Sequence, residues 1–122
     1  MIGYTMVGTN DFEKAKSFYD AVLAELGGKR RGAGERMQAY SAGGTSPAFY
    51  VCRPHDGKPA TSGNGTMISL VAPSREVVDA VYKKALASGA KDEGAPGLRG
   101  ETFYGAYFRD LDGNKLCVYK SG

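Results

Sequence analysis

Two stretches of the sequence repeat apolar residues at the spacing of an amphipathic helix. Within residues 11–27 and 74–89 the apolar positions lie three or four apart, so they share one helix face. Asn10 with Glu13 resembles a capping box before the first stretch, and Ser74 is a candidate N-cap for the second. The apolar positions are Phe12, Ala15, Phe18, Tyr19, Val22, Leu23 and Leu26, and then Val77, Val78, Val81, Tyr82, Ala85 and Leu86.

Short apolar runs between glycine-rich turns predict strands around each helix. The two halves repeat, because Tyr82 follows Tyr19 and Leu86 follows Leu23 by the same 63 positions. Each half therefore predicts the order βαβββ. The expected strands are 2–8, 29–31, 37–41 and 48–53, followed by 66–72, a weak segment near Lys91, 103–109 and 115–120.

This repeat predicts an α+β fold of two βαβββ modules that form a curved mixed sheet, a half-open barrel with the helices outside. We expect one domain over residues 1–122, with a first module at about 1–53 and a second at 65–122. The connector, 54–64, is rich in Gly, Pro and small polar residues. Pockets favour the junctions between such units, so a ligand cavity is expected between the modules.

Composition excludes several classes of protein. The net charge is only +3, and Lys29, Arg30 and Arg31 form the single tight basic cluster, so no basic stripe for nucleic acid is present. No apolar run approaches the roughly 18 residues that span a bilayer, so we expect no membrane partner and a cytoplasmic location. Cys52 and Cys117 are not at metal-ligand spacing, and we interpret them as reduced thiols.

Three motifs resemble those of the vicinal oxygen chelate superfamily, which includes glyoxalases, bleomycin resistance proteins and extradiol dioxygenases. The first is residues 4–11 with the helical pair Phe18-Tyr19, and the second is residues 63–70. The third, residues 107–117, contains Arg-Asp-Leu-Asp-Gly-Asn and is similar to the family's Arg-Asp-Pro-Asp-Gly-Asn turn. The resemblance covers the whole chain and implies the βαβββ fold derived above.

The resemblance also implies a metal site whose usual ligands are absent here. Metal-binding members carry a His on the first strand and a Glu on the last strand of each module. The matching positions are Tyr4, Met67, Cys117 and, within a residue or two, Phe49. Because hard cations prefer carboxylate oxygens, we expect no metal and no cofactor. A soft ion held by Met67 and Cys117 is the alternative.

Three further residues carry candidate chemistry. His55 is the only histidine and lies in a Pro- and Gly-flanked loop, so a surface position is expected. Cys117 has no adjacent His or helix N-terminus to activate it, which favours a packed thiol. Arg99 lies in the glycine-rich loop 94–100, where it either pairs with an acidic ligand at the cavity mouth or is solvated.

These observations predict a small-molecule binding protein. We expect a metal-free cavity lined by Tyr4, Phe49, Met67, Arg99 and Cys117, with Tyr4 as a hydrogen-bonding group and Met67 as an apolar contact. One alternative is a lyase, isomerase or dioxygenase of glyoxalase type, and another is a scaffold whose cavity has collapsed. The apolar surface of a half-open sheet also predicts a homodimer.

Overall fold

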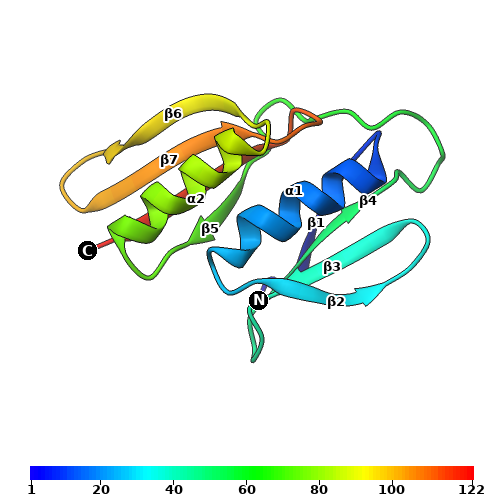
Figure 1. Ribbon diagram of the computed structural model, residues 1–122, viewed down its shortest axis with the longest axis horizontal. Coiled ribbons are helices and arrows are strands. Elements are labelled where there is room, and N and C mark those ends of the chain that lie inside the picture. The colour runs from blue at the N-terminus through cyan, green and yellow to red at the C-terminus, as the bar shows by residue number, and fades with distance from the viewer.

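A computed structural model describes residues 1–122 and contains two helices and eight strands (Figure 1). The first half of the chain forms β1 (Tyr4–Gly8), α1 (Phe12–Ala24), β2 (Lys29–Ala33), β3 (Met37–Ser41) and β4 (Ala48–Cys52). The second half forms β5 (Ile68–Val71), α2 (Arg75–Ala87), β6 (Lys91–Leu98), β7 (Phe103–Arg109) and β8 (Lys115–Ser121). Both halves therefore have the predicted order βαβββ.

The strands form two mixed sheets that do not close on each other. The first sheet has the order β1-β4-β3-β2 and the second the order β5-β8-β7-β6. In each sheet the edge strand before the helix pairs in parallel with the last strand, and the remaining pairs are antiparallel. The predicted α+β fold of two βαβββ modules is confirmed, and β1 and β5 hold equivalent edge positions.

The two helices lie side by side on the same side of the sheets (Figure 1). Each helix buries its apolar face against its own sheet, so the opposite face of each sheet has no helix over it. The buried apolar side chains form one cluster that includes residues of both helices and both sheets. Phe18, Tyr19 and Val22 come from α1, whereas Val78, Val81 and Ala85 come from α2. This shared core joins the two modules.

The N-cap of α2 is the predicted residue, but that of α1 is not. The Ser74 side chain accepts a hydrogen bond from the Val77 amide, as expected. At α1 the cap is Asp11, which accepts from Lys14 N at 3.1 Å. Asn10 is not the cap because its amide group makes two hydrogen bonds to the backbone of Ala60, at 2.7 and 3.2 Å. Asn10 thus holds the connector against the start of α1.

The glycine-rich segment after Lys91, expected to be a loop, is a strand as far as Leu98. β6 continues to Leu98 because its backbone pairs with β7, with Gly97 opposite Gly105 and Leu98 opposite Tyr104. Register shifts interrupt this pairing, which agrees with the weak strand pattern of the sequence.

Neither helix has the length and apolar character needed to cross a membrane.

Candidate functional site

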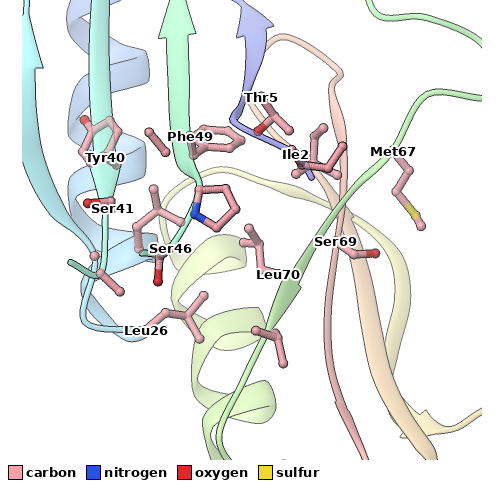
Figure 2. Close-up of a pocket in the computed structure, with 17 residues that line it drawn as sticks. Ile2, Thr5, Leu26, Tyr40, Ser41, Ser46, Phe49, Met67, Ser69 and Leu70 are labelled. Atoms are coloured by element: carbon pink, nitrogen blue, oxygen red, sulfur yellow. The ribbon is translucent and has the colours of Figure 1, made fainter. Parts of the chain in front are cut away.

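A cavity of about 460 Å³ lies between the two modules (Figure 2). Its walls come from β1, the C-terminal end of α1, the β3–β4 hairpin and β5. Thr5 and Phe49 are register partners on the helix-facing side of the first sheet, and Leu70 approaches them from β5. Leu26 and Pro47 complete the apolar wall. The cavity therefore lies where the first module meets β5, the strand that the repeat relates to β1.

The cavity is predominantly apolar, since 11 of its 17 lining residues are hydrophobic. No Asp, Glu, Lys, Arg or His side chain lines it. Thr5, Ser41 and Ser46 add hydroxyl groups, which both donate and accept hydrogen bonds. Such walls suit a mainly apolar molecule with few polar atoms.

Tyr40 is the only cavity residue with an acidic hydroxyl, and this group is already engaged. Its oxygen lies 2.9 Å from Oδ1 of Asp20 and 3.0 Å from the carbonyl oxygen of Lys16. Burial, followed by the hydrogen bond to Asp20, raises the pKa of Tyr40 well above its ordinary value. The hydroxyl thus stays protonated at neutral pH, and the cavity has no group that exchanges protons readily.

The turn between β7 and β8 contacts β1 and α1 at a second junction between the modules. Hydrogen bonds, rather than a cavity, occur at this junction. The carboxylate of Asp110, at the end of β7, accepts from the hydroxyl of Tyr19 in α1. It also accepts from the amides of Asp112 and Asn114, each at 2.9 Å. The Asn114 side chain donates to Asp110 and to the Gly8 carbonyl, again at 2.9 Å. The turn 110–114 therefore connects β1 and α1 to the second module.

The sequence profile of the Glyoxalase/Bleomycin resistance protein/Dioxygenase superfamily matches residues 1–118. The chain belongs to this superfamily. No curated protein matches the chain. Among solved structures, a glyoxalase/bleomycin resistance protein from Albidiferax ferrireducens is 38% identical, with a TM-score of 0.92, and the match covers 100% of this chain and 99% of that one.

More distant structures share the fold. A hypothetical protein from S. aureus is 25% identical, with a TM-score of 0.77, over 96% of this chain and 91% of that one. The fosfomycin resistance protein FosX from Mesorhizobium loti is 14% identical, with a TM-score of 0.72, over 100% of this chain and 92% of that one. At this identity the likeness to FosX concerns the fold alone.

The superfamily's first and last ligand positions in module one lie on opposite faces of the sheet. Phe49 is buried and lines the cavity, whereas the side chain of Tyr4 is on the helix-free face and is 63% exposed. Met6 pairs with Tyr50 in the register, and the Tyr50 ring centre is 5.1 Å from that of Tyr4. Ala48, the register partner of Tyr4, and Tyr50 therefore share a face with Tyr4, and each lies one position from Phe49.

The corresponding residues of module two, Met67 and Cys117, share the helix-free face of the second sheet. Ser69 pairs with Cys117, and Met67 lies two positions before Ser69. Met67 reaches the edge of the cavity, but its side chain points away from Leu70 and the cavity centre (Figure 2). Cys117 is fully buried, and burial raises the pKa of its thiol. The structure therefore brings Met67 and Phe49 to the cavity, but not Tyr4 or Cys117.

The metal of the superfamily does not fit the residues at these positions. Tyr4, Met67, Cys117 and either Phe49 or Tyr50 contain no imidazole or carboxylate. No three His, Cys, Asp or Glu side chains are grouped elsewhere in a way that would hold an ion. A divalent cation would thus lack the charged oxygen ligands that balance its desolvation.

Neither His55 nor Arg99 lines the cavity. His55 is exposed in the connector, as expected. Arg99 follows β6 directly, and its guanidinium is hydrogen-bonded to three carbonyl oxygens near the β6–β7 hairpin. Of the two positions considered for Arg99, the exposed one describes it, and it does not lie at the mouth of this cavity. Conversely, sequence reasoning missed Leu26, Pro47 and Leu70, because apolar periodicity indicates which side chains are buried but not where a gap remains.

Proposed function

We propose that the chain binds a small, mainly apolar organic molecule in the cavity between its modules, without a metal. The observation that carries this proposal is the 460 Å³ cavity with apolar walls. Ligand pockets typically enclose roughly 300–1,000 Å³ and combine apolar walls with a few polar groups. A cavity of this size also argues against a scaffold whose interior has collapsed.

Binding without turnover is favoured by the chemistry of the cavity wall. Enzymes of glyoxalase type need a metal, an acid or a base close to the reacting atoms. The lining residues include no carboxylate, imidazole or amine, and the hydroxyl of Tyr40 is held by Asp20. Sequestration of a ligand requires only shape and the hydroxyls of Thr5, Ser41 and Ser46.

The proposal is tested by titrating the protein with N-phenyl-1-naphthylamine, a neutral apolar dye whose fluorescence rises in apolar sites. We expect saturable binding, and we expect Leu70→Trp to weaken it at least tenfold because the larger ring fills the cavity. The matched control is Leu98→Trp, since Leu98 is half exposed on β6 and does not line the cavity. Equal affinities for both variants would contradict the proposal. Native mass spectrometry of freshly purified protein would reveal a ligand retained from the cell.

We further propose that a second copy of the chain covers the rim of this cavity. Ile2, Met67 and Val71 line the rim and are 58%, 42% and 68% exposed. Ile2 and Met67 precede the edge strands β1 and β5, and Val71 is the last residue of β5. The outer backbone groups of these two strands are unpaired within the chain. An exposed apolar rim of this kind favours a symmetric dimer. Light scattering at micromolar concentration should give twice 12.9 kDa, and Val71→Lys should shift the mass toward the monomer.

The cytoplasm is the location that we propose for the chain. Both cysteines, Cys52 and Cys117, are free and buried, which suits a reducing compartment. Fractionation of cells that express the protein would test this location.

A further inference from the structure

Five of the residues that line the cavity carry a hydroxyl group, and two of these groups are already engaged within the chain. The five are Thr5, Tyr40, Ser41, Ser46 and Ser69. The Tyr40 hydroxyl is bonded to Asp20. The Ser41 oxygen accepts from Nε of Arg31 at 3.1 Å and from the Gly43 amide at 3.3 Å, so both of its lone pairs are occupied. Both oxygens are therefore committed to the fold.

Ser46 and Ser69 meet water rather than the interior of the cavity. Ser46 is exposed in the loop between β3 and β4. Ser69 is also exposed, and its side chain points away from Leu70 and the cavity centre (Figure 2). A hydrogen bond from either residue to a ligand would replace one to water, so its net contribution to affinity is small.

Thr5 carries the one lining hydroxyl that is both free and partly enclosed. The residue is half-buried in β1 beside its register partner Phe49, and Leu70 of β5 approaches from the other module (Figure 2). Its hydroxyl has no hydrogen-bond partner in the chain, whereas every fully buried polar atom of a side chain has one. The Thr5 oxygen is thus accessible from the cavity, where it offers a ligand an unpaired donor and acceptor among apolar side chains.

The wall formed by module two has no such group, because the repeat places Ile68 where Thr5 stands in module one. Ile68 follows Thr5 by the same 63 positions and also lines the cavity. Leu70, two positions later on the same face of β5, continues this aliphatic wall. No charged side chain lines the cavity, so a charged ligand would lose its hydration without gaining a partner.

We infer that the cavity selects uncharged molecules that carry one hydroxyl group on a compact apolar frame, and that Thr5 recognises this group. The inference rests on the proposed binding in the cavity, and adds the class of ligand and its orientation. The ligand hydroxyl bonds to Thr5 on β1, and the apolar frame lies against Ile68 and Leu70 on β5. A hydrocarbon of the same shape leaves Thr5 unpaired, and a carboxylate is rejected because it must give up its water.

The test compares three molecules that share one frame, namely cumene, para-isopropylphenol and para-isopropylbenzoate. Each is titrated against protein loaded with N-phenyl-1-naphthylamine, and the concentration that displaces the dye gives its affinity. We expect the phenol to bind about threefold to tenfold more tightly than cumene, the range for one neutral hydrogen bond. The benzoate should bind at least about tenfold more weakly than the phenol.

Thr5→Val removes the hydroxyl, keeps the β-branched shape and breaks no hydrogen bond between side chains. In this variant the phenol should bind within about twofold of cumene, and the affinity for cumene should be unchanged. Thr45→Val is the matched control, because Thr45 is exposed in the loop between β3 and β4 and does not line the cavity. This control should retain the full preference for the phenol.

The possible outcomes separate this inference from the proposed function. The inference alone is overturned if the phenol and cumene bind the unchanged protein equally well, if the benzoate binds as tightly as the phenol, or if Thr5→Val retains the preference. Cavity binding then stands, because the dye is still bound and Leu70→Trp still weakens it. A dye that does not bind, or that Leu70→Trp leaves bound with unchanged affinity, overturns the proposed function and this inference with it.

Discussion

The hydroxyl of Tyr19 donates a hydrogen bond to the carboxylate of Asp110, which lies 91 residues further along the chain. Both residues are buried, at 1% and 6% exposure. Burial, together with the negative charge of Asp110, raises the pKa of Tyr19, so its hydroxyl remains a neutral donor. This bond connects the helix of the first module to the β7–β8 turn of the second.

Loss of this hydrogen bond should destabilise the whole fold. We expect Tyr19→Phe to lower the free energy of unfolding by about 1.5–3 kcal/mol, the range for hydrogen bonds to charged groups. Tyr82→Phe is the control, because Tyr82 bonds to Asp92 at 2.8 Å in an exposed position, and it should cost less than about 1 kcal/mol. Urea unfolding measures both. Equal losses would show that the buried network does not stabilise the junction.

The ion pair between Asp20 and Arg30 should contribute a pH-dependent part of the stability. Hydrogen bonds from the Arg30 guanidinium, two at 2.8 Å, lower the pKa of Asp20 in the folded chain. Since the folded value is the lower one, the stabilisation is present above the unfolded pKa of roughly 3.9 and disappears as the pH falls through the folded value.

Asp20→Asn should therefore cost stability at pH 7, by less than about 1 kcal/mol for a half-exposed pair. At pH 2 the variant and the unchanged protein should unfold at more similar urea concentrations. The control is Glu25→Gln, because Glu25 forms no ion pair with a neighbouring side chain. A stability difference for Asp20→Asn that persists undiminished at pH 2 would exclude this source of pH dependence.

Both thiols should react slowly in the folded protein. Cys52 and Cys117 are 5% and 0% exposed, and burial raises the pKa of each. Because the thiolate is the reactive form, we expect labelling by a disulfide reagent to be at least about tenfold slower than in urea. Rapid labelling of Cys117 without denaturant would instead indicate an activated nucleophile.

The cap of α1 distinguishes two neighbouring residues with different roles. Asp11→Ala should cost about 1 kcal/mol, as should Ser74→Ala at α2, because each removes the acceptor of a free helix amide. Asn10→Ala should instead release the connector, which hydrogen exchange at the Ala60 amide would detect. Faster exchange at Ala60 in Asp11→Ala than in Asn10→Ala would reverse this assignment.

The sequence predicted the elements and the repeat because helix and strand periods depend on local residues. Tyr82 follows Tyr19 at the fixed offset of the sequence repeat, and this repeat predicted two modules with the same order of elements. β6 was harder to predict, since glycines at 94 and 97 have no side chain to show a strand's alternation. Its existence depends on hydrogen bonds to β7, a partner that local sequence does not specify.

The candidate site was less predictable than the fold. A shift of one residue along a strand moves a side chain to the other face, so a position predicted only to within a residue or two of Phe49 left the face undetermined. The cavity arises from incomplete packing between Leu26, Pro47 and Leu70, which are distant in sequence. No single motif contains that information, because Leu26 and Leu70 have the pattern of ordinary apolar positions and Pro47 lies in the loop between β3 and β4.

The two junctions of the modules have diverged from the symmetry of the repeat. The turn 110–114 carries Asp and Asn side chains that bond across its junction, whereas the turn 42–46 carries only Ala, Gly, Thr and Ser. Tyr82, the counterpart of Tyr19, bonds within its own module. The turn 110–114 thus holds the modules together at one junction, whereas the other junction contains the cavity. Substitutions within 41–47 and 68–71 therefore reshape the cavity wall without removing any hydrogen bond of the turn 110–114.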